Sequence, residues 1–293
     1  MSRRGPPVLR HSLATRVSDP MKHVIYVDKG VIILNKPSGL VCQCNSRVEK
    51  HRSMEDLSFY SLLQGLKDAL GMSSPLYPVH RLDKYTTGSL ILARTDRTAR
   101  DLSSQFQNRT IEKIYLALVR GGRQTFPARS GQIRNYIKYD HGNALIVPER
   151  AGKPAATDWE LVASSTRAPI SLLRLRLLTG LKHQLRVHLA EVLKAPILGD
   201  TAHSKTEAVI DIPQNRLFLH SSRLSFFRYR SQGPNKRYRF GLTAPVPSDF
   251  RELCQALKIY PEDKEVDGGV YSDDKEITEE ELADLQGQWW AAP

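Results

Sequence analysis

The 293-residue sequence contains few cysteines and no long apolar run. Its three cysteines, Cys42, Cys44 and Cys254, cannot form the disulfide framework of a secreted domain, and Cys42-x-Cys44 lacks the spacing and second pair of a zinc site. No stretch approaches the ~20 apolar residues of a membrane-spanning helix. The sequence therefore predicts a soluble intracellular protein with reduced thiols, without a membrane, metal or cofactor partner. We expect a monomer.

Acidic residues are scarce over most of the chain and concentrated at its end. Lys and Arg number 43 against 31 Asp and Glu, a net charge of +12. Residues 261–293 hold eleven acids and two lysines, a net of −9, so the first 260 residues carry +21. A body this basic favours a polyanion such as RNA, because neutralising phosphates releases counterions. A basic enzyme with no nucleic-acid partner is the alternative.

The N-terminus has no acid before Asp19 and four arginines in its first 18 residues. Leu9, Leu13 and Val17 are spaced four apart, on one side of a helix. Residues 1–22 therefore have the composition of a mitochondrial transit peptide, although a basic RNA-contacting arm or an unstructured end has the same character. We expect a mitochondrial location, with the cytoplasm or nucleus as the alternative.

Strands and helices alternate without a regular strand–helix–strand rhythm, which predicts an α+β fold. Residues 23–260 are expected to form one catalytic domain, and residues 261–293 a flexible acidic tail. Within the tail, Thr278 to Glu281 has the pattern of a helix-capping box. Apolar patterning predicts strands at 24–27, 31–34, 88–93, 111–119, 157–163, 170–178 and 216–227, and helices at 62–70, 99–106, 182–193 and from 248.

A carboxylate stands in a loop before an apolar strand, in His80-Arg81-Leu82-Asp83 followed by residues 86–93. Catalytic groups concentrate in loops held by rigid elements. Taken alone, however, the tetrapeptide fits an Asp that pairs with Arg81 and caps a turn.

Two further segments carry polar groups in a functional pattern. His183 and Arg186 are three residues apart, on one face of a helix expected to begin near residue 182. The helix dipole disfavours positive side chains at a helix start, so two of them there indicate a site for an anion. A solvated basic face is the alternative. Lys113 and Tyr115 share one face of a strand, and a tyrosine there can stack on a base or pack across strands.

These segments together resemble the RluA-type family of pseudouridine synthases, and they occur in one collinear order between about 24 and 257. Each motif alone is modest, but the set in this order is specific. The motifs are Asn35-Lys36-Pro37-Ser38-Gly39, the block 80–95, Lys113-x-Tyr115, Lys153-Pro154-Ala155-Ala156-Thr157, the block 180–189, Ile197-Leu198-Gly199-Asp200, Leu219-His220 and Ala244-Pro245-Val246-Pro247.

The resemblance implies the pseudouridine synthase fold, with a central mixed, mainly antiparallel sheet flanked by helices and loops. It implies isomerisation of uridine in RNA without a metal or cofactor. Asp83 would be the catalytic nucleophile, Tyr115 would lie against base and ribose, and Arg186 would pair with Asp83. Arg81 would help to fill the gap left by a flipped base.

Further RNA contacts are expected from basic and histidine side chains in the same motifs. The family usually has an arginine where Leu181 stands, and Lys182 is the neighbour that could supply the missing charge. The residues expected to bind RNA are Lys36, His80, Arg81, Lys113, Lys182 and His183.

The substrate expected from the N-terminus is large-subunit ribosomal RNA, as in a fungal mitochondrial member of the family. A tRNA pseudouridine synthase is the second reading. A catalytically inactive RNA-binding ribosome-assembly factor is a third. A hydrolase using His80, Asp83 and His183 is a fourth, but no metal set or nucleophile–base pair accompanies those residues.

Overall fold

The computed structural model describes residues 19–42, 54–140, 143–204, 210–230 and 236–290. The predicted N-terminal extension up to residue 18 and Cys44 lie outside them. The described strands form one sheet of fourteen, in the order β14-β1-β2-β4-β10-β5-β9-β8-β6-β7, with β3, β11, β12 and β13 attached beside this path. Within the described residues every strand pair is antiparallel except β4 with β10. The predicted α+β class with a mixed, mainly antiparallel sheet is confirmed.

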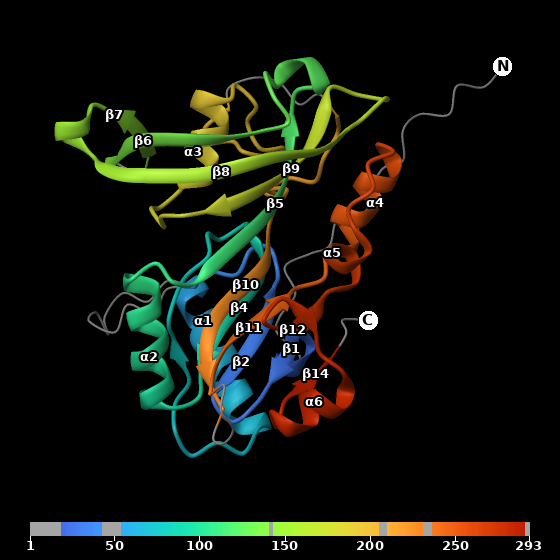
Figure 1. Ribbon diagram of the computed structural model, residues 1–293. Helices are drawn as coiled ribbons and strands as arrows, with labels where there is room; N and C mark the ends of the chain where they lie inside the picture. Colours follow the sequence, from blue (N-terminus) through green and yellow to red (C-terminus); the bar gives the residue numbers. More distant parts are fainter. Residues whose placement is uncertain (1–18, 43–53, 141–142, 205–209, 231–235, 291–293) are drawn as a thin grey trace.

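The first half of the chain builds one side of the molecule (Figure 1). Runs of β-branched and aliphatic residues form its strands, and the two helices coincide with the predicted apolar spacing. The elements are η1 (Pro20–His23), β1 (Val24–Val27), β2 (Val31–Lys36), α1 (Met54–Ala69), β3 (Tyr77–Pro78), β4 (Thr87–Ala93), α2 (Asp96–Gln107) and β5 (Glu112–Arg120).

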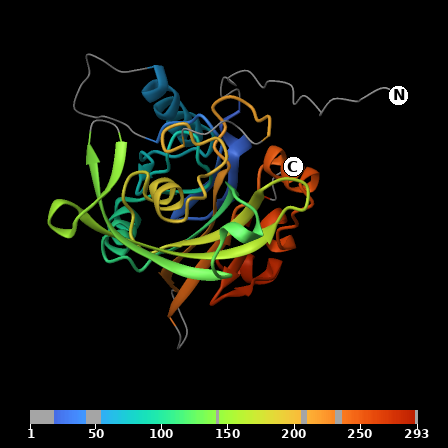
Figure 2. The same cartoon turned by 90° about the horizontal axis from the view of Figure 1, so that it is seen from above.

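The second half adds the opposite side and then returns to the first. Seen from above, the long strands β6 and β8 curve around α3 (Figure 2). The elements are η2 (Arg123–Thr125), β6 (Ser130–Asp140), β7 (Asn143–Val147), η3 (Glu149–Ala151), β8 (Lys153–Ser164), β9 (Ile170–Leu177), α3 (Gln184–Val187), η4 (His188–Val192), β10 (Leu219–Tyr229), β11 (Arg237–Thr243) and α4 (Ser248–Ala256).

The core is divided between the two faces of the sheet. Leu62 of α1 packs in the cluster that contains Ile32 of β2, and Leu102 of α2 packs in the cluster that contains Ile33. Because neighbouring strand residues point to opposite faces, burial of both demands a helix on each side. Packing on both faces holds the sheet in place, so the loops at the strand ends begin and end at fixed positions.

The acidic tail is not a flexible appendage, and that prediction is wrong for residues 262–290. β12 pairs with β11, and β14 adds to the free edge of β1. Leu282, Leu285 and Trp289 pack against the α2-side core, so apolar residues spaced between the acids hold the segment. The elements are α5 (Asp263–Asp267), β12 (Gly269–Ser272), β13 (Lys275–Glu276), α6 (Glu279–Asp284) and β14 (Gln288–Trp289). The predicted capping box at Thr278 is present.

The helix predicted over 182–193 begins later and is irregular. α3 has four residues and continues as a π-type turn, η4. His183 precedes α3 in a left-handed conformation, with φ of 57°. The prediction that His183 lies within the first helical turn is therefore wrong.

Candidate active site

Asp83 lies in a short loop that the preceding and following strands hold in place. The backbone N–H of Thr86 donates to the Asp83 carbonyl at 3.1 Å, which closes a turn, and the N–H of Gly39 donates to the Lys84 carbonyl at 2.9 Å. Leu82 is buried beneath the loop, whereas Asp83 is half-buried at its surface. The carboxylate is therefore presented to the outside from a fixed backbone.

Gly88 shows why the chain is tightly specified just after this loop. A Cβ atom there would lie 2.3 Å from the Ser221 carbonyl oxygen, and φ is +108°. The close approach belongs to the parallel pairing of β4 with β10, in which Gly88 is opposite Ser221. Any larger residue would push β4 away from β10 at the base of the Asp83 loop.

Lys36 does not contact RNA, and that prediction is wrong. The side chain is fully buried, and its ammonium group donates to the carbonyls of Pro37, Leu40 and Lys84 at 2.8, 2.8 and 2.9 Å. All three of its N–H groups are thus used inside the protein. Burial lowers its pKa to about 8, so it still carries its charge at neutral pH. Lys36 ties the β2 end to the residue after Asp83.

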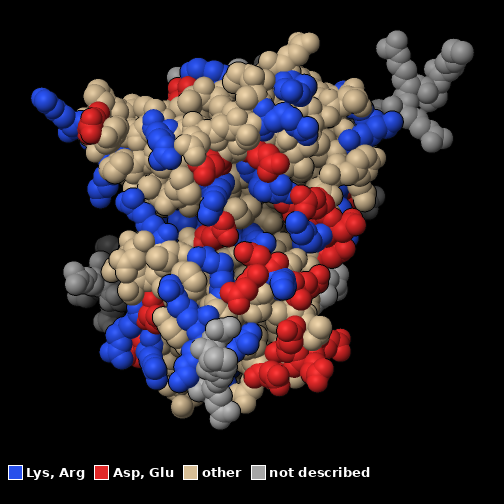
Figure 3. Space-filling model, in the orientation of Figure 1, with Lys and Arg blue, Asp and Glu red and all other residues tan. Residues whose placement is uncertain are grey.

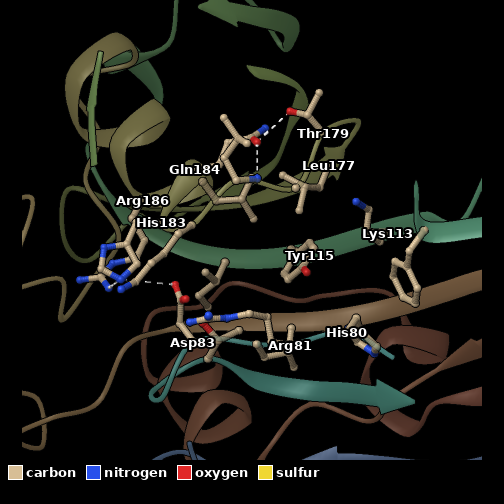
Figure 4. A pocket seen from close by; sticks show the side chains of 18 of the residues that line it. His80, Arg81, Asp83, Lys113, Tyr115, Leu177, Thr179, His183, Gln184 and Arg186 are labelled. Atoms are coloured by element: carbon tan, nitrogen blue, oxygen red, sulfur yellow. Dashed lines mark hydrogen bonds and ion pairs between the residues drawn. The ribbon is translucent and has the colours of Figure 1, made fainter. Parts of the chain in front are cut away.

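His80 and Arg81 occupy the same loop but differ in exposure. The backbone N–H of Ile91 donates to His80 Nε2 at 2.9 Å, and the His80 ring stacks on Phe106 with 4.8 Å between centroids. Burial lowers the pKa of His80 to about 3, so the ring is neutral. Its side chain therefore anchors the loop to β4. Arg81 is exposed and lines the cavity beside Asp83 (Figure 4).

Tyr115 and Lys113 project from β5 into the same cavity, as their shared strand face predicts (Figure 4). Tyr115 is 7% exposed, and burial raises the pKa of Tyr115 to about 12. Its phenol is neutral at physiological pH and presents a flat ring with one hydroxyl group. Lys113 is half-buried beside it.

Arg186 pairs with Asp200 and not with Asp83, which corrects the expected ion pair. Arg186 Nε and Nη2 lie 2.9 and 2.6 Å from the two Asp200 oxygens, a bidentate geometry. Burial alone would lower the pKa of Arg186, but the Asp200 carboxylate outweighs it and the pKa is raised. Burial likewise opposes ionisation of Asp200, yet Arg186 holds its pKa below the ordinary value. The guanidinium is thus fixed near Asp83 by a third residue.

His183 is the side chain that faces the Asp83 carboxylate, with His183 Nε2 4.0 Å from Asp83 Oδ2 (Figure 4). Arg186 Nη1 lies 3.2 Å from the same Nε2, so this nitrogen accepts, and Nδ1 lies 3.4 Å from His203 Nε2. Burial lowers the pKa of His183 to about 4 despite the nearby Asp83. The ring is neutral, and its contact with Asp83 is not an ion pair at neutral pH.

The turn before α3 is held by one glutamine. Gln184 Oε1 accepts from the Thr179 hydroxyl and the Leu181 N–H at 2.8 and 3.1 Å, and Nε2 donates to the Ala156 carbonyl and Thr157 hydroxyl at 3.0 and 3.1 Å. Every polar group of the buried amide is satisfied. The turn that carries Lys182 and His183 is therefore rigid.

Leu181, at the position of the family arginine, packs against an apolar cluster that includes Ile137 and Val187. Lys182 is exposed; its ammonium lies 4.0 Å from the Tyr139 ring centroid and donates to the Tyr139 hydroxyl. A cation thus stands at the cavity rim one residue from the missing arginine. Whether it contacts RNA stays a prediction.

The predicted residues, with the exception of Lys36, converge on one cavity of about 570 Å³. That volume suits a single nucleotide-sized ligand. Sequence reasoning missed the supporting residues Asp200, His203 and Gln184, although the Ile197-to-Asp200 motif contained a signal for the first. The lining includes His80, Arg81, Asp83, Arg109, Lys113, Tyr115, Thr179, Leu181, Lys182, His183 and Arg186.

The described part of the chain contains no group of three His, Cys, Asp or Glu side chains placed to hold a metal ion. In the same residues no helix is long and apolar enough to cross a bilayer. The chemistry available in the cavity is that of one carboxylate, a neutral phenol, neutral histidines and several cations.

Comparison with known proteins gives this arrangement a family. Residues 30–191 match the RNA pseudouridylate synthase family, more than half of the chain. This chain belongs to that family. A "Ribosomal large subunit pseudouridine synthase D" of Borreliella burgdorferi is 33% identical, over 78% of this chain and 70% of the relative. A "Dual-specificity RNA pseudouridine synthase RluA" of Vibrio vulnificus is 32% identical, over 80% of this chain and 86% of the relative.

RNA pseudouridine synthases are isomerases, so the predicted enzyme class and RluA-type family are confirmed. The chain spans 58% of the length of a 32% identical "tRNA pseudouridine synthase C" of Pectobacterium carotovorum. A solved structure titled "Human RNA Pseudouridylate Synthase Domain Containing 4" has a TM-score of 0.62 at 24% identity, covering 83% of this chain and 95% of that one. The likeness confirms the predicted pseudouridine synthase fold.

Proposed function

We propose that this enzyme converts uridine to pseudouridine in large-subunit ribosomal RNA, with Asp83 as the catalytic carboxylate. The observation that carries the reaction is the Asp83 carboxylate at 4.0 Å from a neutral His183, in a cavity that Tyr115 also lines. No second carboxylate or metal group competes for the role among the described lining residues.

The reaction is an isomerisation and consumes no partner. Asp83 promotes cleavage of the bond between ribose C1′ and uracil N1, the freed uracil rotates, and C5 bonds to C1′. The proton lost from C5 is balanced by one gained at N1. A target uridine must leave its stack, at a cost of roughly a few kcal/mol, which stacking and phosphate contacts offset.

The remaining groups have roles that follow from their fixed positions. Tyr115 offers a buried ring for the base and a neutral hydroxyl. Arg186, held by Asp200, keeps a positive charge near Asp83. Arg81 is exposed beside the cavity and is available to replace the flipped base in the RNA stack.

The ribosomal substrate is supported by the printed name of the Borreliella relative. A tRNA substrate is the second candidate, supported by relatives named tRNA pseudouridine synthase C. A mitochondrial site of action is supported by the basic composition of residues 1–18. An inactive ribosome-assembly factor would need neither Asp83 nor Tyr115 in the cavity.

Pseudouridine mapping of ribosomal and transfer RNA, with and without the gene for this protein, tests the proposal. The expected result is loss of at least one large-subunit rRNA pseudouridine and its return with the wild-type protein. Loss confined to tRNA would replace the rRNA substrate, and no loss anywhere would overturn the function. A fluorescent fusion of residues 1–20 that stays in the cytosol would overturn the mitochondrial location.

A further inference from the structure

A second cavity of about 390 Å³ adjoins the active-site cavity. The two share Arg109, Lys113 and Leu177 in their linings. The far wall of the second cavity comes from Phe227, Arg239 and Asp274, beyond the residues 30–191 that match the family. The remaining lining residues are Thr110, Ile111, Glu112, Arg176 and Leu178.

The second cavity has an excess of positive charge. Its anions are already engaged, since Glu112 pairs with Arg176 at 3.0 Å and Asp274 pairs with Arg223 at 2.6 Å. Among the described residues, the side chains of Arg109 and Lys113 have neither an ion-pair nor a hydrogen-bond partner, and these are the two cations on the shared wall.

The two unpartnered cations lie close enough to repel one another. Burial, and then the nearby Arg109, lower the pKa of Lys113 to about 8. The two positive charges repel one another, and an anion between them would be attracted to both. Arg109 directly follows the C-cap of α2 and has the left-handed backbone, with φ of 58°, in which helices commonly end. The end of α2 thus fixes the backbone of Arg109 beside Lys113, and the two side chains are placed to receive one anion.

The outer wall is pre-organised for the same ligand. Arg239 lies opposite Phe227 in the β10–β11 pairing, with its guanidinium carbon 4.3 Å from the Phe227 ring centroid. Arg239 Nη1 also donates to the Thr110 carbonyl at 3.5 Å. These contacts restrain the side chain and leave further N–H groups for an oxyanion.

The surrounding surface has the same polarity. Lys and Arg side chains gather over α2 and the adjoining part of the sheet, whereas Asp and Glu gather over α5 and α6 (Figure 3). A polyanion that leaves the active-site cavity on the α2 side meets a mainly basic surface, and on the α5–α6 side it meets repulsion.

We propose that the second cavity binds a phosphodiester group of a nucleotide next to the target uridine, through Arg109, Lys113 and Arg239. The target nucleotide occupies the first cavity, and the shared wall places the neighbouring phosphate against Arg109 and Lys113. This assignment rests on the proposed function.

The probe is a fluorescently labelled RNA of nine nucleotides, with one central uridine and cytidines elsewhere. Single neutral methylphosphonates replace the linkage on either side of the uridine, and Kd is measured with an Asp83→Asn protein so that no turnover occurs. One of the two substitutions is expected to weaken binding roughly tenfold. Arg109→Gln is expected to weaken the natural RNA similarly, and the two changes together are expected to cost little more than either alone.

Salt dependence supplies an independent readout. Arg109→Gln is expected to reduce the slope of log K against log salt by about 0.7, the loss of one phosphate contact on a single strand. Arg109→Lys should restore most of the affinity, and Arg239→Gln should reproduce the loss if Arg109→Gln folds poorly. Arg251→Gln, an exposed arginine on α4, is the matched control and should change nothing.

Two results together would overturn the second cavity as a phosphate site. The first is that Arg109→Gln and the methylphosphonates raise Kd independently, so that their effects multiply. The second is that the salt slope is unchanged in both arginine variants. The proposed function has a separate readout, because pseudouridine formation is scored in the protein with Asp83 intact. Normal conversion without coupling refutes only this inference, and absent conversion refutes the function whatever the binding shows.

Discussion

At the scale of single residues, the site is held by side chains that do not line the cavity. Lys36 donates to the carbonyl of Lys84, directly after Asp83, and Asp200 fixes Arg186. A lysine in a motif shared with an RNA-modifying family suggests RNA contact from the sequence alone. Burial is a property of the folded chain, so only the structure distinguishes a support from a contact.

Lys36→Met tests this support. The apolar chain keeps most of the volume, but three buried carbonyls lose their donor, and we expect a loss of roughly 2–4 kcal/mol in unfolding free energy. kcat for pseudouridine formation should fall because the Asp83 loop is no longer fixed. RNA affinity and its salt slope should stay at wild-type values. A smaller salt slope with normal kcat would instead show that Lys36 contacts RNA and does not support the Asp83 loop.

At the scale of elements, the sequence predicts the strands and helices that carry continuous apolar runs or clear helical spacing. β1, β2, β4, β5 and β9 were predicted within a few residues. β6 was missed because most of its residues are exposed or half-buried, so it lacks an apolar run. The prediction of a flexible tail rests on its net charge and overlooks the scattered apolar residues Leu282, Leu285 and Trp289, which pack against the core.

The candidate site follows the same division. Asp83, Tyr115 and Arg186 could be placed from motifs, since their chemistry is local. Their partners could not. Arg186 donates two hydrogen bonds to Asp200, and that contact depends on how the chain turns between η4 and β10. Contacts across the tertiary fold have no periodic signal in the sequence.

The tail strand β14 provides an element-scale prediction. Trp289→Ala removes an aromatic ring from the α2-side core and weakens the pairing of β14 with β1. We expect a loss of roughly 2–4 kcal/mol, measured by urea denaturation, with RNA affinity unchanged. Truncation at Pro261 should be far more damaging, since it also removes β12. Trp290→Ala, at a more exposed neighbour, is the matched control. Unchanged stability together with tighter RNA binding would show that the tail only screens charge.

At the scale of the whole molecule, buried neutral histidines make the fold sensitive to acid. Burial lowers the pKa of His220 to about 4. His220 Nε2 lies 3.1 Å from the Ala244 carbonyl, which can only accept, so Nε2 carries the proton. Thr87 Oγ1 then donates to Nδ1 at 2.9 Å. Burial also lowers the pKa values of His183 and His188 to about 4.

The sign of the pH effect follows from these pKa values. Between pH 6.5 and about 4, His220 is protonated in the unfolded chain but stays neutral in the folded chain. Its contribution to the unfolding free energy is therefore fully present above pH 6.5 and is lost as pH falls. For His220 alone the loss approaches roughly 3 kcal/mol. Urea denaturation from pH 7.5 to 4.5 measures it. His220→Gln should be less stable at pH 7 but should lose less on acidification, and an unchanged pH dependence would refute the assignment.

The proposed mechanism depends on one carboxylate that lines the cavity, Asp83, and Asp83→Asn alters that group with almost no change in shape. The purified variant is compared with wild type for pseudouridine formed in the ribosomal RNA that mapping identifies, and for Kd on the same RNA. The expected result is loss of detectable pseudouridine, with RNA affinity within about threefold of wild type and an unchanged denaturation midpoint. Pseudouridine formation near the wild-type rate would contradict the role of Asp83 and, with it, the proposed mechanism.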